Sequence, residues 1–274
     1  MGGLFVETIG FVGAGNMAEA ILQGIIAAGI FAPEAVFISD VRSERLAQLA
    51  GQYGVLPLHD NAPLAAKADI LVLSIEPKTM RDALDSIRGH LRHDALVVSI
   101  VAGARMADIA AVLGDVPIIR VMPNAPALIN EGASALYPND RARPLLAKVR
   151  DIFACVGEAV VVDDEALIDA VTAVSGSGPA YYFLMMEKMI EAAVSLGLSE
   201  ETAKTLVIQT AKGAALLASQ AAQDNETPAD LTRKVATPGG TTEAALTVFA
   251  EGGFGQLVER AIRQAHLRSQ TLSA

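Results

Sequence analysis

The sequence predicts an α/β domain built on a doubly wound sheet, followed by an all-α domain. Up to about Asp164, short apolar runs alternate with helical patterns, as expected for parallel strands covered by helices on both faces. After Asp164 the strand-like runs stop and only long helical patterns follow. The 274 residues are 52% hydrophobic and 19% charged, so the chain can bury a sizeable core in each half. We therefore place the domains at residues 1–164 and 165–274.

In the first half, apolar, β-rich runs predict the strands and the amphipathic stretches between them predict the helices. The predicted strands are Thr8–Val12, Ala35–Ser39, Ile70–Ile75, Leu96–Val101, Ile118–Met122, Ala133–Tyr137 and Glu158–Val162. The predicted helices are Met17–Ala28, Ser43–Tyr53, Asn61–Ala66, Thr79–Leu91, Met106–Leu113 and Arg143–Phe153. Connections between successive parallel strands should be right-handed.

The second half is predicted to be helical throughout. The segments are Glu165–Val174, Pro179–Leu196, Ser199–Gln223, Pro228–Ala236, Thr242–Glu251 and Gly255–Leu272. Pro179–Leu196 and Ser199–Gln223 are apolar on nearly every side, and such helices must be buried. A domain of about 110 residues has little interior for both, so we expect it to dimerise through them rather than form a self-contained bundle.

A glycine motif joins the first strand to the first helix. Gly13 allows a tight turn after Thr8–Val12, and Gly15 leaves room for a pyrophosphate to approach the backbone. Ala18, in place of a third glycine, lets the helix pack closely on the strand. Free N–H groups at the helix start, around Asn16 and Met17, then face the anion. The pattern indicates a Rossmann-type dinucleotide site rather than an ordinary tight turn.

The second strand ends at Asp40, where a ribose-binding acid is expected. Asp40 would accept hydrogen bonds from a free ribose diol and repel a 2′-phosphate, which favours NADH. Arg42 could bind that phosphate, which favours NADPH. The sequence leaves the preference between the two cofactors open.

Later strand ends are expected to close over the nicotinamide, because ligands of doubly wound sheets bind beyond the carboxyl ends of the strands. Each of these segments alone could be a plain connecting loop. Together with the glycine motif they indicate a cofactor cleft. The candidate residues are Ile75, Pro77, Ala102, Gly103 and Asn124.

Two loop motifs stand in the helical half, Ser175–Ala180 and Thr237–Glu243. The first has the serine, glycine and proline of a helix start. The paired glycines of the second can direct successive N–H groups at a carboxylate, and its threonine hydroxyls could bond a ring nitrogen. Alternatively, the second is a plain helix start capped by Thr241 or Thr242.

Composition excludes several classes of function. A net charge of −10 argues against nucleic acid and anionic membranes as partners. A single cysteine, Cys155, permits no internal disulfide and fits a reducing compartment. We find no membrane-length apolar run, no signal peptide and no metal-ligand pattern, so we expect a cytoplasmic protein without a metal site.

Taken together, the motifs resemble those of the pyrroline-5-carboxylate reductase family, in order and over nearly the whole chain. The resemblance implies NAD(P)H-dependent reduction of 1-pyrroline-5-carboxylate to L-proline, the last step of proline biosynthesis. It also implies a homodimer interlocked through the helical domains, often assembled further, with active sites built from both subunits. The segments that carry it are Gly13–Met17, Arg120–Pro126, Glu131–Gly132, Asp169–Tyr181, Pro238–Thr242 and Glu251–Phe254.

The resemblance also implies roles for individual residues. Backbone groups of Gly239, Gly240 and Thr241 would bind the substrate carboxylate, and Thr242, the candidate catalytic residue, would hydrogen-bond the ring nitrogen. Asn61 would lie near the adenosine end of the cofactor. The full set of candidate substrate-binding residues is Ser175, Gly176, Ser177, Thr237, Gly239, Gly240, Thr241 and Thr242.

The chain departs from the family's usual pattern at three places. The first is the end of the second strand, where Asp40 favours NADH although the family commonly prefers NADPH. Glu76 stands where a lysine is common, with Lys78 two positions later, which affects a contact to the cofactor. Ala125 replaces a usual threonine. Glu76 and Ala125 could both broaden the range of imines that the protein accepts as substrates.

The expected chemistry needs little from the protein beyond alignment. A cyclic imine can carry its own proton on nitrogen, so hydride transfer requires no strong protein acid. Two alternatives remain. One is a related imine or β-hydroxyacid oxidoreductase, and in the β-hydroxyacid case Lys188 would be the proton donor. The other is a nucleotide-binding protein without turnover.

Overall fold

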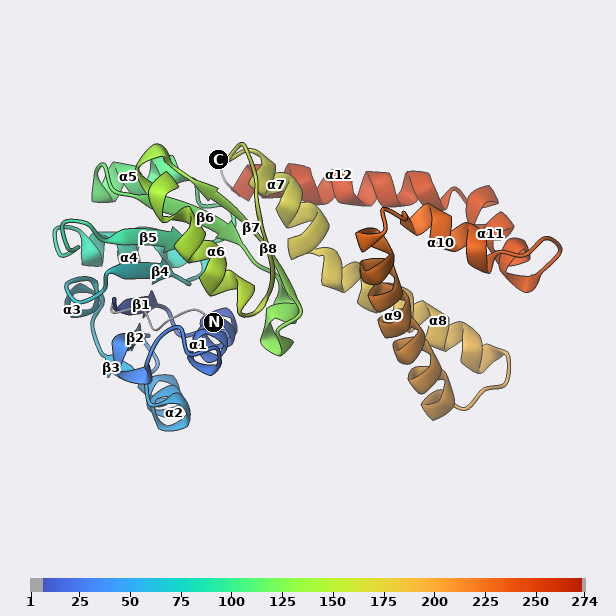
Figure 1. Ribbon diagram of the computed structural model, residues 1–274, viewed down its shortest axis with the longest axis horizontal. Coiled ribbons are helices and arrows are strands. Elements are labelled where there is room, and N and C mark those ends of the chain that lie inside the picture. The colour runs from blue at the N-terminus through green and yellow to red at the C-terminus, as the bar shows by residue number, and fades with distance from the viewer. Residues whose placement is uncertain (1–6, 273–274) are drawn as a thin grey trace. The chain divides into compact units, whose positions relative to one another are not determined.

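A computed structural model describes residues 7–272 and confirms an α/β fold followed by helices (Figure 1). The chain forms two compact units. One contains the chain up to Pro179 together with the stretch from Gln264, and the other contains Ala180–Arg263. The change from strands to helices falls where predicted, because the last strand ends at Val161. The compact units divide later than Asp164, since residues 165–179 and 264–272 belong to the same compact unit as the sheet.

The described residues of the first unit form one eight-stranded sheet in the order β3-β2-β1-β4-β5-β6-β7-β8. Neighbouring strands run parallel except β6 and β7. The strands are β1 (Ile9–Val12), β2 (Val36–Ser39), β3 (Leu56–Leu58), β4 (Ile70–Leu73), β5 (Leu96–Ser99), β6 (Ile118–Met122), β7 (Gly132–Pro138) and β8 (Gly157–Val161).

Helices cover both faces of this sheet. They are α1 (Asn16–Ala27), α2 (Ser43–Tyr53), α3 (Asn61–Ala65), α4 (Met80–Ile87), α5 (Met106–Leu113) and α6 (Leu146–Ala154). Side chains of a strand alternate between faces, so Phe11 packs in the core beneath α1, α2 and α6 while Val12 packs beneath α3, α4 and α5. This arrangement confirms the doubly wound sheet that the alternating pattern predicts.

The connection between β6 and β7 explains the antiparallel pair. A parallel neighbour needs a crossover of a dozen or more residues, whereas residues 123–131 hold only the short 3₁₀ helix Ala125–Ile129. The chain therefore turns back along β6. The carboxyl end of β6 and the start of β7 lie next to each other as a result.

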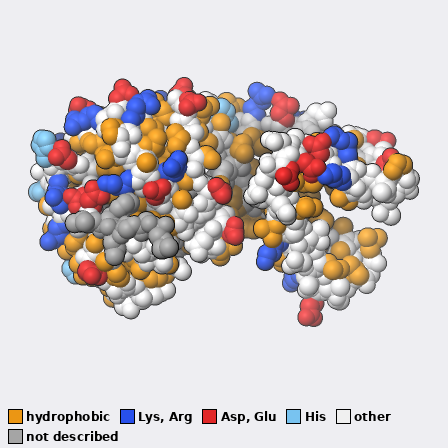
Figure 2. Space-filling model, viewed as in Figure 1, with side chains coloured by type: hydrophobic (Ala, Val, Ile, Leu, Met, Phe, Trp, Pro, Cys, Tyr) orange, Lys and Arg blue, Asp and Glu red, His pale blue; other side chains and the backbone are white. Residues whose placement is uncertain are grey.

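Helices follow β8 to the end of the described chain: α7 (Leu167–Val171), α8 (Gly178–Ser195), α9 (Glu200–Gln223), α10 (Pro228–Val235), α11 (Thr241–Glu251) and α12 (Phe254–Leu272). In the single chain α8 and α9 expose large apolar side chains, among them Tyr182, Phe183 and Leu216. Hydrophobic side chains are visible on the surface of the second compact unit, Ala180–Arg263 (Figure 2). No helix between residues 7 and 272 is long and apolar enough to cross a membrane.

Candidate functional site

The glycine turn follows β1, at the point where the strand order reverses between β1 and β4. Gly13 has a φ of +93°, and a Cβ there would lie 2.4 Å from the Ser74 carbonyl oxygen. Only glycine fits this position. A Cβ at Gly15, in contrast, would meet no atom within 4 Å. The space beside Gly15 is therefore open, as the approach of a pyrophosphate requires.

The start of α1 leaves its backbone donors available to a ligand. Gly15 is the N-cap residue, and no side chain caps the helix. Asn16 is exposed, whereas the Met17 side chain packs against two clusters of the hydrophobic core. The Met17 side chain is apolar, so Met17 can hold an anion only through its backbone N–H. The uncapped N–H groups and the helix dipole together favour the binding of an anion at the start of α1.

Asp40 is fixed beside this turn by several donors. Its Oδ2 accepts a hydrogen bond from the Ala14 N–H at 2.9 Å, and its Oδ1 accepts from the Arg42 N–H at 2.9 Å. The Arg42 guanidinium bonds to both carboxylate oxygens, at 2.9 and 3.0 Å. Burial raises the pKa of Asp40, but the hydrogen bonds from Arg42 and Ala14 outweigh it and lower that pKa to about 2. Asp40 is therefore a fixed negative charge.

Sequence reasoning missed a second residue that holds the turn. Arg45, on α2, donates from Nε to the Ala14 carbonyl oxygen at 2.9 Å and forms an ion pair with Glu19. The backbone on both sides of Ala14 is thus held, one peptide group by Asp40 and the other by Arg45. The periodicity that predicts α2 contains no signal for this contact.

Asn61 lies at the start of α3 and connects three elements. Its Oδ1 accepts from the Ser39 hydroxyl at 2.7 Å, and its Nδ2 donates to the Ser86 hydroxyl at 3.0 Å. Ser39 precedes Asp40, so Asn61 does lie near the predicted ribose-binding acid. One N–H and one lone pair of its amide remain after these bonds. Its contact with the adenosine end stays a prediction.

Of the other predicted strand-end residues, Ile75 and Pro77 follow β4 beside the glycine turn, whereas Ala102 and Gly103 follow β5 near the end of α12. A Cβ at Gly13 would lie 2.8 Å from the Ile75 side chain, so Ile75 packs directly against the glycine turn, while Pro77 is exposed nearby in the chain. Gly103 has a φ of +76°, and a Cβ there would lie 3.0 Å from the Leu272 carbonyl oxygen. The end of α12 therefore accounts for that glycine. Ala102 is half-buried beside it.

The Ser175 motif leads into a helix start, as predicted, because α8 begins at Gly178, one residue before the predicted Pro179. A turn of π-helix that the sequence did not predict, Thr172–Gly176, continues from α7 and ends just before α8, of which Pro179 is the second residue. The Ser177 N–H donates to the Thr172 carbonyl oxygen, five residues back, at 2.8 Å. Such π turns are frequent at functional sites because they displace backbone groups from the helical pattern. The Asn124 amide bonds to Ser175 within this turn.

The Thr237 motif lies in the other compact unit and also leads into a helix start. Gly239 has a φ of +72°, and the Gly240 N–H donates to the Thr237 carbonyl oxygen at 3.0 Å. Gly240 is the N-cap residue of α11 and no side chain caps the helix, so neither Thr241 nor Thr242 has the capping role that was the alternative interpretation. The Gly239 N–H donates to Glu243 Oε2 at 2.7 Å. A carboxylate of the chain itself thus occupies a donor predicted for the substrate.

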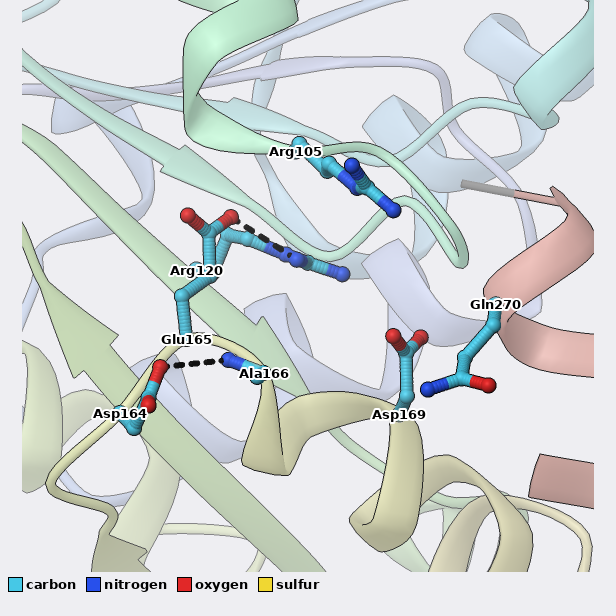
Figure 3. A pocket seen from close by; sticks show the side chains of 7 residues that line it. All are labelled: Arg105, Arg120, Asp164, Glu165, Ala166, Asp169 and Gln270. Atoms are coloured by element: carbon cyan, nitrogen blue, oxygen red, sulfur yellow. Dashed lines mark hydrogen bonds and ion pairs between the residues drawn. The ribbon is translucent and has the colours of Figure 1, made fainter. Parts of the chain in front are cut away.

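A polar pocket of roughly 380 Å³ contains none of the predicted site residues (Figure 3). At its wall the buried Arg120 donates to Glu165 at 2.8 Å, and the same Glu165 oxygen accepts from the Met106 N–H at the start of α5. Asp169 accepts from the Ser269 hydroxyl at 2.6 Å. These bonds join β6, α5, α7 and α12, which gives the charges a structural role. The residues that line the pocket are Arg105, Arg120, Asp164, Glu165, Ala166, Asp169 and Gln270.

Lys188 has surroundings that do not suit a proton donor of the β-hydroxyacid type. Its ammonium pairs with Glu191 at 2.8 Å and lies 3.6 Å from Glu187, on an exposed face of α8. The hydrogen bond that Lys188 donates to Glu191 raises the pKa of Lys188. Within residues 7–272 no cluster of three or more His, Cys, Asp or Glu side chains could hold a metal ion.

Comparison with known proteins gives matches to both halves of the chain. The family model "Pyrroline-5-carboxylate reductase dimerisation" matches residues 165–272, and "NADP oxidoreductase coenzyme F420-dependent" matches residues 8–103. The pyrroline-5-carboxylate reductase of Pseudomonas aeruginosa is 44% identical over 267 residues, which are 97% of this chain and 96% of that protein. This chain belongs to the pyrroline-5-carboxylate reductase family.

Solved structures of the family share the fold along the whole chain. A pyrroline-5-carboxylate reductase from Coxiella burnetii is 34% identical with a TM-score of 0.92, covering 98% of this chain and 100% of that chain. Plasmodium falciparum pyrroline carboxylate reductase, solved with NADP bound, is 29% identical with a TM-score of 0.87, covering 99% and 100%.

Family membership confirms the enzyme class and the broad organisation. The chain is an oxidoreductase with a Rossmann-type domain for NAD(P)H, and its C-terminal region matches the part through which the family dimerises. The apolar surface of α8 and α9 has the character expected of such a region. The roles of individual site residues stay predictions.

Proposed function

We propose that this chain reduces 1-pyrroline-5-carboxylate to L-proline with a reduced nicotinamide dinucleotide, the last step of proline biosynthesis. The observation that carries the proposal is the 44% identity, along 97% of the chain, to a reductase of that name. The glycine turn supports it, because Gly15 borders open space and α1 is uncapped. When bound, the cofactor supplies the hydride; the residues of the chain bind and orient the two reactants.

We propose that the first compact unit holds the cofactor through its backbone and one acid. The N–H groups at the start of α1 bind the pyrophosphate, and Asp40 accepts from the ribose hydroxyls. The chain uses NADH better than NADPH in this proposal, because Asp40 carries a fixed negative charge and the Arg42 guanidinium is already bonded to it. A 2′-phosphate would have to separate that pair.

Substrate binding is assigned to two loops. The N–H groups of Gly239, Gly240 and Thr241 bind the substrate carboxylate once Glu243 has moved off Gly239, and the Thr242 hydroxyl bonds the ring nitrogen. The turn containing Ser175 borders the ring. No side chain has to donate a proton, since the protonated imine already carries one, so the enzyme's contribution is alignment.

The chain forms a homodimer, or a higher assembly of dimers, through its C-terminal helices. The lone Cys155 fits a reducing compartment, which for a biosynthetic enzyme is the cytoplasm.

The experiment follows the absorbance of NADH and of NADPH separately, with purified protein and 1-pyrroline-5-carboxylate. Turnover with formation of proline supports the proposal, and the ratio of the two kcat/KM values gives the cofactor preference. A folded protein that binds either nucleotide yet oxidises neither would overturn the assigned reaction. Activity on another cyclic imine alone would assign the same chemistry to a different substrate.

A further inference from the structure

The Asn124 amide is held in one orientation by its partners. Its Oδ1 accepts from the Ala133 N–H at 2.8 Å, and its Nδ2 donates to the Ser175 carbonyl and hydroxyl oxygens, both at 3.2 Å. A backbone N–H can only donate and a carbonyl oxygen can only accept, so exchanging the amide's oxygen and nitrogen would break these bonds. The Nδ2 group of Asn124 is therefore engaged by Ser175 within the protein, and the amide is not free to turn toward a cofactor.

Pro179 explains why the Ser175 carbonyl needs a side-chain donor. In a regular helix this carbonyl would accept from the N–H four residues later, which is position 179. Proline has no N–H, so that bond cannot form. Ser175 is half-buried, so a carbonyl oxygen left there without a partner would be costly, and Asn124 supplies a donor.

A second contact places the same turn on the end of β6. A Cβ at Gly176 would lie 2.6 Å from the methyl group of Met122, so the turn rests directly on this side chain. Met122 is the last residue of β6, and Asn124 follows two residues later. The π turn is thus fixed by packing at Gly176 and by hydrogen bonds at Ser175.

We propose that Asn124 is a positioning residue for the substrate, not a cofactor ligand. It holds the Ser175–Ser177 turn against the carboxyl end of β6 and so determines where the imine ring lies relative to the hydride donor. This inference rests on the proposed function, in which that turn borders the substrate. Small displacements of aligned reactants lower rates strongly, by up to about 100-fold for an error of 1 Å.

The test compares Asn124→Asp with Asn124→Ala. The Asn124→Asp carboxylate would keep the acceptor for the Ala133 N–H but lose both donors to Ser175. We expect kcat/KM for the imine to fall at least about tenfold in both variants, with a lower kcat as well as a higher KM. The dissociation constant for NADH, measured without substrate, should not change. Hydrogen exchange of the amides in residues 172–178 should become faster.

A second substitution tests the step that involves Pro179. Pro179→Ala returns a backbone N–H four residues after Ser175, so the double variant Asn124→Ala, Pro179→Ala should regain part of the lost kcat/KM. A double variant no more active than Asn124→Ala overturns the role given to the Ser175 carbonyl.

Three results would contradict the positioning role. They are an unchanged kcat/KM, unchanged hydrogen exchange in residues 172–178, and a loss of NADH affinity that matches the loss of activity. The last result would make Asn124 a cofactor ligand. A wild-type protein inactive on the imine would refute the proposed function instead, while the exchange and NADH measurements would still decide what Asn124 holds.

Discussion

Asp40, at the end of β2, accepts a hydrogen bond from the backbone N–H of Ala14 in the glycine turn, at 2.9 Å. The acid expected to contact the ribose and the turn expected to contact the pyrophosphate are therefore one hydrogen-bonded unit. Arg42 completes it with two bonds to the same carboxylate. Because these donors keep Asp40 ionised, the charge that faces a 2′-phosphate does not depend on pH in the neutral range.

This unit predicts how the cofactor preference responds to mutation. Asp40→Asn keeps an acceptor for the Ala14 N–H but removes the charge and releases Arg42. We expect this change to raise the NADPH-to-NADH ratio of kcat/KM about tenfold, which corresponds to about 1.4 kcal/mol. The double variant with Arg42→Ala should lose that gain. A ratio unaffected by Asp40→Asn would show that selectivity lies elsewhere.

The two glycines of the turn predict opposite effects of an added methyl group. Gly13→Ala forces a Cβ against the Ser74 carbonyl at a positive φ and should destabilise the fold by more than about 2 kcal/mol. Gly15→Ala meets no atom and should cost at most about 1 kcal/mol, as an N-cap change, yet it should weaken NADH binding clearly. Urea unfolding and nucleotide titration of both variants measure this. Equal free energies of unfolding for Gly13→Ala and Gly15→Ala would contradict the predicted difference between these two positions.

The Arg120–Glu165 pair predicts a large effect on stability. Glu165 neutralises a guanidinium whose side chain is 5% exposed and accepts the Met106 N–H. Glu165→Ala should lower the free energy of unfolding by about 3 kcal/mol, because it leaves a buried charge unpaired. Asp85→Ala, which removes two exposed ion pairs, is the matched control and should cost less than about 1 kcal/mol. Similar losses in both would refute the structural role.

The sequence predicts those parts of the fold that depend on local patterns. Buried strands are continuous apolar runs and the glycine turn is a short motif, so both can be recognised without tertiary information. β3 was not predicted because its three residues are too few to show a strand pattern and include Pro57, which argues against a strand. The π turn was missed because one additional residue in a helical turn leaves the surrounding apolar pattern nearly unchanged.

Partners in the site were harder to predict, since they depend on contacts distant in sequence. Asp40 follows from its place after the second strand, but its bond to Ala14 does not. Arg45 acts 31 residues away from the turn that it holds, and Asn124 acts 51 residues before Ser175. A sequence motif predicts which residue type occupies a position, whereas the tertiary structure determines which hydrogen-bond donor and acceptor come into contact.

Glu243 predicts a gain on mutation. Its carboxylate accepts the Gly239 N–H at 2.7 Å, a donor that we assign to the substrate carboxylate. Glu243→Ala removes this competitor and a like charge, so KM for the imine should fall several-fold while kcat changes little. Steady-state kinetics at fixed saturating NADH measure both constants. A higher KM would instead mean that Glu243 helps to hold the loop in its binding conformation.

Thr242 gives the most direct test of the proposed chemistry. It follows the Gly239–Gly240 turn, it is half-buried, and no side chain caps α11, so its hydroxyl is not committed to a helix cap. Thr242→Ala should lower kcat about 100-fold, within the range typical for loss of one positioned hydrogen-bonding group in an active site, and leave the dissociation constant for NADH unchanged.

Thr247→Ala is the matched control for Thr242 on the same helix. The Thr247 hydroxyl donates to the Glu243 carbonyl oxygen at 3.0 Å, as helical threonines commonly do. Its loss should affect neither kcat nor nucleotide binding, so it reports what a threonine-to-alanine change does to α11 alone. Undiminished turnover in Thr242→Ala would remove Thr242 from the reaction. The protonated imine would then be oriented by the backbone of the Gly239–Gly240 turn alone.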